Sequence, residues 1–217
     1  MAFVAHVMTL ASIFSSGTAG LQLGTRHAVV PAATTSPVLW YLTRTMGVSA
    51  YVALSFSVIL GMLRSVARKS AERISWVVDE LHQFVATLAG LLVAGHLLTL
   101  ALDPFMPFTI INLLLPINEP YSPTAVAFGI FGLYSMVLLL VSSWLRKRMR
   151  YSWWRGVHFV SFLAFAMVTL HGWFAGSDSG EPWMRAIYAF ATSAVLFLIL
   201  VRFFVGAPSV SPSSRAG

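Results

Sequence analysis

Four histidines lie inside apolar stretches of the 217-residue chain, in two pairs with nearly matched spacing. His82 and His96 are fourteen residues apart in one stretch, and His158 and His171 are thirteen residues apart in another. An ionisable side chain within a lipid-spanning helix is costly, so four of them in two pairs indicate a bound ligand. Imidazole is a common axial ligand of haem iron, and haem is therefore the ligand that we expect.

The composition predicts an all-α integral membrane protein. Hydrophobic residues make up 58% of the chain and charged residues 10%, with a mean hydropathy of +0.80. Five apolar runs are long enough to cross about 30 Å of hydrocarbon: 38–63, 75–102, 122–145, 156–175 and 184–205. A sixth candidate, residues 2–23, has Ser and Gly in its second half. No Lys or Arg precedes its apolar part, so we expect a retained first helix and a six-helix transmembrane bundle.

Charged residues predict the orientation of the bundle in the cell membrane. Two connections carry most of the basic residues, one from Arg64 to Arg73 and the other from Arg146 to Arg155, and Arg26 in the external 24–37 segment is a minor exception. The positive-inside rule places both basic loops in the cytoplasm, and the same parity places the C-terminus there. The outward connections carry acids that would make the outer mouth acidic, namely Asp103, Glu119, Asp178 and Glu181. The net charge of +7 thus reflects topology in a lipid bilayer, and no nucleic-acid partner is expected.

The absence of cysteine narrows the redox chemistry. Without Cys the chain forms no disulfide, no iron–sulfur cluster and no covalent C-x-x-C-H haem attachment, so any haem is b-type. No G-x-G-x-x-G follows a predicted strand and no P-loop is present. Electrons must therefore come from a separate donor.

The number of spans between the two histidine-bearing helices predicts which histidines lie at the same depth. One span separates the two histidine-bearing helices, so these run parallel, and His82 and His158 share the inner level while His96 and His171 share the outer one. Fourteen residues return His96 to within ~40° of the direction of His82, about 21 Å along the axis. This arrangement predicts two stacked b haems between two parallel helices. His171 lies ~140° from His158 on a straight helix, so a π-bulge, a kink near Gly172 or a tilt is needed.

Other readings of the histidines remain open. Core imidazoles can link neighbouring helices by hydrogen bonds, or relay protons in a transporter. A zinc or copper site would need three or four donors at one level, where only two histidines are expected to meet.

Three arginines are candidate partners of anionic haem propionates. Arg155 is the candidate at the inner level, although it also ends a basic run suited to lipid phosphates. Arg44 and Arg185 are the candidates at the outer level. Arg44 lies about seven residues inside its span, where it either snorkels or has a buried partner.

Two further segments complete the expected architecture. Asp79 and Glu80 precede His82 and could relay protons, but their position near a helix start favours stabilisation of the helix dipole. The proline-rich connection 103–123 is too short to span, and we expect a short interfacial helix capping the outer haem. The domains are thus a first helix with its external loop (1–37), a haem-binding transmembrane domain (38–205) and a disordered cytoplasmic tail (206–217).

The paired histidines resemble the ferric reductase-like transmembrane domain shared by membrane ferric reductases, NADPH oxidases and the haem subunit of the periplasmic methionine sulfoxide reductase. Three local strings are similar to this family: Trp40-Tyr-Leu-Thr-Arg44-Thr-Met-Gly47, Trp154-Arg155-Gly-Val-His158 and His171-Gly-Trp-Phe-Ala-Gly176-Ser-Asp178. The last two look like the short bacterial members, which lack the flavin and NADPH module. Leu100 stands where the oxidases place a further histidine, so superoxide production is not expected.

The resemblance implies an oxidoreductase subunit that passes electrons through two b haems to the outside. The donor would be a flavin reductase or quinol, and the acceptor ferric iron or a periplasmic redox protein. A haem-bearing membrane anchor of one specific periplasmic reductase is the first alternative. A non-redox transporter with a histidine proton relay is the second.

Overall fold

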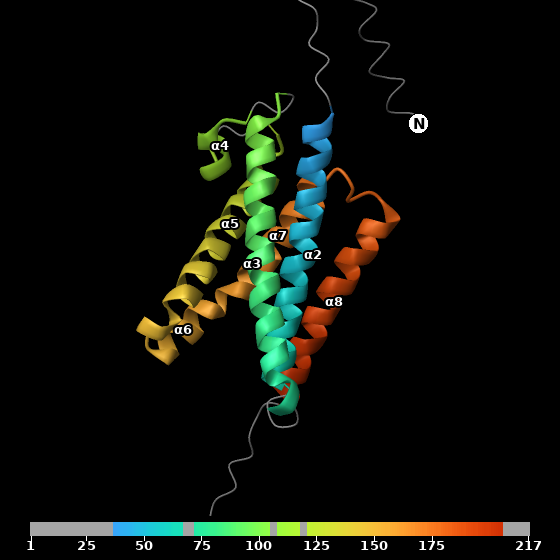
Figure 1. Cartoon of the computed structure of the whole chain (residues 1–217). Helices are drawn as coiled ribbons and strands as arrows, with labels where there is room; N and C mark the ends of the chain where they lie inside the picture. Colours follow the sequence, from blue (N-terminus) through green and yellow to red (C-terminus); the bar gives the residue numbers. More distant parts are fainter. Residues whose placement is uncertain (1–36, 67–71, 105–107, 118–120, 206–217) are drawn as a thin grey trace, which may run out of the picture. The chain divides into compact units, whose positions relative to one another are not determined.

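The computed structural model describes residues 37–66, 72–104, 108–117 and 121–205, and over these residues it is all-helical (Figure 1). Three long helices each form one element, α2 (Val38–Val66), α3 (Glu72–Leu102) and α5 (Pro123–Trp144), and α8 (Pro182–Val205) closes the described part. Between α5 and α8 lie a 3₁₀ turn (Leu145–Arg148), α6 (Tyr151–His158) and α7 (Val160–Ala175). The predicted first helix, most of its loop and the predicted disordered tail lie outside the described residues.

Five segments are long and apolar enough to cross a membrane, which confirms the five clear spans predicted from the sequence. They cover Val38–Ser65, Trp76–Leu102, Pro123–Arg148, Tyr151–Ala175 and Pro182–Phe204. Large apolar side chains point outward along them, with Phe190, Phe203 and Leu91 among the most exposed. Such surfaces suit hydrocarbon and not water, so the chain is a multi-pass membrane protein.

Helix α2 makes the central contacts of the bundle. It packs against α3, α7 and α8, while α5 packs against α7 and α6 and touches α3. The largest core cluster joins α2, α7 and α8 and includes Tyr51, Phe165, Met184 and Tyr188. The rings of Tyr51 and Tyr188 meet edge to face with centroids 4.9 Å apart, a favourable aromatic geometry. Both histidine-bearing spans are therefore held against the same helix, α2.

The fourth span, Tyr151–Ala175, has an interruption of one residue, Phe159, directly after His158. The Phe159 N–H donates to the carbonyls of Arg155 at 3.3 Å and Gly156 at 3.2 Å, a tightened turn that ends α6 before α7 begins. Gly172, where a kink was suggested, lies within α7. A Cβ at Gly172 would lie 2.5 Å from the Tyr188 hydroxyl, so this glycine permits close packing between α7 and α8.

A short helix does form in the proline-rich connection. Helix α4 (Ile110–Leu114) begins with a capping box, in which Thr109 accepts from the Asn112 N–H at 3.3 Å and Asn112 accepts from the Thr109 N–H at 3.3 Å. The Tyr134 hydroxyl of α5 donates to the Leu114 carbonyl and so connects α4 to the bundle.

Candidate functional site

The structure brings His82 of α3 and His158 of α6 together, as the parallel helices predict. Their ring centroids are 6.1 Å apart and their planes are inclined at 76°. Two imidazoles bonded to one metal ion have centroids about 6 Å apart, because each metal–nitrogen bond is about 2.0–2.1 Å. The separation of the two rings is therefore compatible with two ligands of one ion.

Two histidines of α3 hydrogen-bond to backbone carbonyls of α2. His82 Nδ1 lies 2.9 Å from the Ser57 carbonyl oxygen, and His96 Nδ1 lies 2.8 Å from the Thr43 carbonyl oxygen. In each case a glycine four residues later contacts the same ring. A Cβ at Gly61 would lie 3.4 Å from His82 Cε1, and a Cβ at Gly47 would lie 3.1 Å from His96 Nδ1.

His171 of α7 is held in the same way by α5. Its Nδ1 lies 2.8 Å from the Ala125 carbonyl oxygen, and a Cβ at Gly129 would lie 2.7 Å from that nitrogen. We call each such carbonyl with its glycine a carbonyl–glycine support, and the three are Thr43/Gly47, Ser57/Gly61 and Ala125/Gly129. Two of the supports hold the histidines predicted to lie at the outer level, His96 and His171.

The spacing of the supports on α2 equals the spacing of the histidines on α3. Gly47 and Gly61 are fourteen residues apart, as are His82 and His96. Because α2 and α3 are successive spans, they are antiparallel, and equal intervals place each histidine beside a glycine at its own depth. The α2–α3 interface is thus built to hold two imidazoles.

The hydrogen bonds determine which nitrogen of each ring is free. A carbonyl oxygen can only accept, so Nδ1 of His82, His96 and His171 carries the proton and Nε2 keeps its lone pair. Metal-binding histidines commonly have this arrangement, in which the second nitrogen donates to a backbone carbonyl. Within the described ranges no group of three or more His, Asp or Glu side chains converges on one point. The donor sets thus fit axial ligation of haem iron and not a tetrahedral metal site.

His158 has a different environment from the other three. The buried atoms His158 Nδ1 and Trp154 Nε1 have no hydrogen-bond partner among the residues that the structure describes. The His158 ring instead stacks on Trp154 one turn earlier, with centroids 5.0 Å apart and planes at 23°. The Arg146 guanidinium lies over the Trp154 ring, 4.6 Å from its centroid.

The comparison with known families decides the family of this chain. The model of the family described as "Ferric reductase like transmembrane component" matches residues 46–169, more than half of the chain. The chain belongs to this family. Comparisons with curated proteins and with solved structures gave no significant match. The resemblance inferred from the paired histidines is confirmed.

Membership of the ferric reductase-like family supports a membrane redox component, since such transmembrane domains generally bind haem. The matched range contains His82, His96 and His158 and ends two residues before His171. The glycines of the three supports, Gly47, Gly61 and Gly129, all lie within it, whereas the Thr43 carbonyl precedes it.

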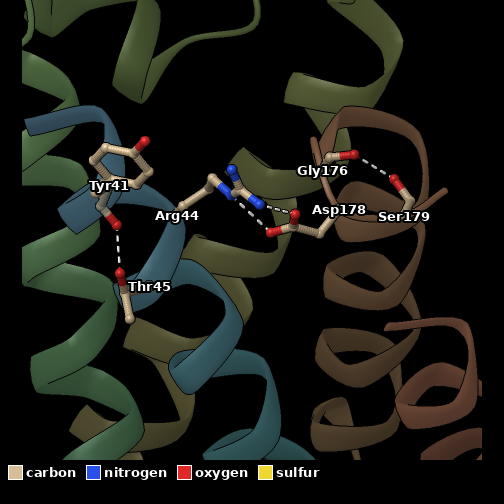
Figure 2. Close-up of polar contacts among 6 residues, drawn as sticks. All are labelled: Tyr41, Arg44, Thr45, Gly176, Asp178 and Ser179. Carbon is tan, nitrogen blue, oxygen red and sulfur yellow. Dashed lines mark hydrogen bonds and ion pairs between the residues drawn. The ribbon is translucent and has the colours of Figure 1, made fainter. Parts of the chain in front are cut away.

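Arg44 has the buried partner that was one of its two predicted environments. Its Nε donates to Asp178 Oδ2 at 2.8 Å, and its Nη2 forms an ion pair with the other carboxylate oxygen. Figure 2 shows the two groups facing each other between α2 and the connection after α7. The guanidinium also lies 4.5 Å from the Trp40 ring centroid. The next carbonyl before Arg44, that of Thr43, holds His96, so this ion pair stabilises the backbone beside the outer level.

The other predicted arginines are exposed. Arg185 Nε donates to the Ser179 carbonyl at 3.3 Å, and Arg155 lies on the surface of α6. Arg146, which lies over the Trp154 ring next to His158, was not identified from the sequence. This arginine is on the 3₁₀ turn and shares no helical periodicity with His158. Contact between any of these arginines and a haem propionate stays a prediction.

Two expectations about acidic residues were wrong. Asp103 and Asp178 are only 5% and 6% exposed, so they do not contribute to an acidic outer surface. Helix α3 begins at Glu72, and Asp79 is therefore too far along the helix to stabilise its dipole. Asp79 forms an ion pair with Arg64 of α2 instead.

Replacing Asp178 by asparagine is expected to destabilise the bundle. The change leaves the partly buried Arg44 charge without its anion, at a cost of about 1–3 kcal/mol. The thermal unfolding midpoint in detergent should fall accordingly. Glu181→Gln is the matched control, because this acid is exposed in the same connection and surface changes usually cost under about 0.5 kcal/mol. Equal midpoints for the two variants would show that the ion pair does not support the fold.

Proposed function

We propose that this chain is a transmembrane b-type cytochrome with two bis-histidine haems. His82 and His158 hold one haem at the inner level, and His96 and His171 hold the other at the outer level. Haem bound between imidazoles supplies a one-electron iron couple. Electrons enter from a flavin reductase or quinol and leave to an external acceptor such as ferric iron or a periplasmic redox protein.

The observation that carries this proposal is the orientation of the histidines. Three of the four rings donate Nδ1–H to a backbone carbonyl and keep Nε2 as a lone-pair donor. A proton relay would favour side-chain or water partners that pass the proton on, whereas a backbone carbonyl cannot be protonated at ordinary pH. Of these three Nδ1 atoms, that of His82 also lies 3.1 Å from a side-chain hydroxyl, Ser57 Oγ. These contacts therefore favour ligation over transport.

The helices around the histidines keep the site rigid. Gly47, Gly61 and Gly129 allow neighbouring backbones to lie close against one side of the imidazole rings, which limits the space beside them. Low-dielectric surroundings strengthen the electrostatic effect of every nearby charge on the redox couple. The Arg44–Asp178 ion pair has no net charge and so limits this effect at the outer level.

The charge distribution supports entry of electrons at the inner level. Helix α6, which carries His158, follows the basic segment from Arg146 to Arg150. We propose that this segment faces the cytoplasm, as the positive-inside rule predicts. It would attract an anionic or acidic donor by long-range electrostatics, which raises association rates. Arg155 and Arg146 are the proposed inner propionate partners, and Arg44 and Arg185 the outer ones.

The test is the visible spectrum of the purified chain. Expression with ample iron and porphyrin precursor is expected to give a red protein with two haems per chain, a Soret band and sharp low-spin bands on reduction. A transporter would be colourless. In proteoliposomes with a reductant outside and a ferric chelate inside, or the reverse, haem-dependent reduction of the chelate measures transfer across the bilayer. A preparation that contains no haem contradicts the proposal.

A further inference from the structure

One of the four histidines is held much less firmly than the others. His82, His96 and His171 each have a carbonyl–glycine support on a neighbouring helix. The buried Nδ1 of His158 has no acceptor in the part of the chain that the structure describes. Its ring contacts Trp154 of its own helix by stacking, a local contact that moves with the helix.

His158 lies beside an interruption of the regular helix. It is the last residue of α6, and Phe159, which separates α6 from α7, keeps helical dihedral angles while its N–H donates to the carbonyls of Arg155 and Gly156. His82 and His96 lie well inside α3, and His171 lies inside α7 with helix on both sides. Of the four histidines, only His158 therefore lies next to an irregular turn.

No second support is available to His158 on α5. Gly129 holds His171 from this helix, but the residues thirteen and fourteen positions later are Ser142 and Ser143. Ser142 is buried and its hydroxyl donates to the Leu139 carbonyl of the same helix at 3.1 Å. The glycine nearest to His158 in sequence, Gly156, has nothing within 4 Å of a built Cβ.

We propose that His158 is the exchangeable ligand of this protein, so that the inner level binds small neutral ligands such as carbon monoxide while the outer level does not. This inference rests on the proposed function. In the exchange, the bond between His158 Nε2 and ferrous iron breaks as the carbon lone pair of carbon monoxide takes its place. No electron or proton is transferred, and the His158 ring moves aside on its own helix.

The expected difference in carbon monoxide affinity between the two levels follows from the missing hydrogen-bond partner of His158 Nδ1. Removing the partner of the second imidazole nitrogen typically weakens metal binding by roughly 10–100-fold. At the outer level both proposed ligands, His96 and His171, have such partners, so carbon monoxide is expected to displace neither of them. At the inner level His82 remains bound through its contact with Ser57 while His158 is displaced.

Carbon monoxide titration of the reduced, purified full chain tests this inference. The wild type is expected to show two classes of haem, one shifting its Soret band at roughly 10–100-fold lower gas concentration than the other. Preparations with one haem per chain assign the levels. His171→Ala should keep the inner haem and bind carbon monoxide tightly, and His82→Ala should keep the outer haem and bind it weakly.

The outcomes separate the inference from the proposed function. A wild type with two haems that form one class, or that do not react at all, overturns the inference and leaves the cytochrome intact. The reverse order of affinities in the two variants also overturns it. A wild type without haem overturns both.

Discussion

Replacing His96 or His171 by alanine is expected to remove one of the two haems and leave the other in place. Each of these residues is one of the two ligands that we propose for the outer haem, and loss of one metal ligand would leave the cofactor without a sixth bond. The haem content of the purified variant should fall from two per chain to one. The reduced-minus-oxidised difference spectrum should lose about half of its amplitude, and transfer across the bilayer should fall by orders of magnitude because one of two carriers is missing.

The double variants are the internal control of this experiment. Residues that act as one unit give non-additive effects, so the double variant at His96 and His171 should have the same haem content as either single variant. A variant with one change at each level, such as His82 and His96, should lose both haems. If His96 and His171 instead remove different haems, the pairing by depth is contradicted although haem binding is not.

The sequence predicted the spans and the pairing of the inner histidines. Apolar runs of sufficient length identify membrane helices because the bilayer has a fixed thickness, and parity then gives the depth of each histidine. The contact between His82 and His158 follows from these two facts alone. The match to the ferric reductase-like family covers both of these residues.

The carbonyl–glycine supports could not be predicted in the same way. Glycine is frequent in membrane helices, and the chain has 15 glycines, so Gly47 and Gly61 are not distinctive by type. Their interval equals that of His82 and His96, which is a usable signal once α2 and α3 are known to pack antiparallel. The sequence alone does not give that register, because several offsets bury similar apolar surfaces.

Polar contacts between residues far apart in the chain could not be predicted from the sequence either. Arg44 and Asp178 are 134 residues apart, and nothing local indicates that a connection after α7 returns to α2. The break after His158 occurs at Phe159, where neither proline nor a glycine marks it.

Replacing Gly129 by alanine is expected to release the outer haem, although the change raises the helix propensity of α5. The new Cβ would lie 2.7 Å from His171 Nδ1, closer than real Cβ atoms approach, so the ring must rotate and lose its bond to the Ala125 carbonyl. Loss of this bond should weaken haem binding at the outer level by roughly 10–100-fold. Two measurements check this prediction. The first is the number of haems per chain after dilution, and the second is the low-spin electron paramagnetic resonance signal of the remaining outer haem.

The other glycines form a graded series of controls for this change. Every Gly→Ala change within a helix gains about 0.8–1.0 kcal/mol of helix propensity, so propensity is the same throughout the series. The nearest approach of the built Cβ to an imidazole is 3.1 Å at Gly47 and 3.4 Å at Gly61, and at Gly156 nothing lies within 4 Å. Haem loss should therefore be greatest for Gly129→Ala, smaller for Gly47→Ala, slight for Gly61→Ala and absent for Gly156→Ala. Equal haem retention across all four variants would mean that the imidazoles do not depend on these close contacts, and it would remove the structural argument for ligation at the observed ring positions.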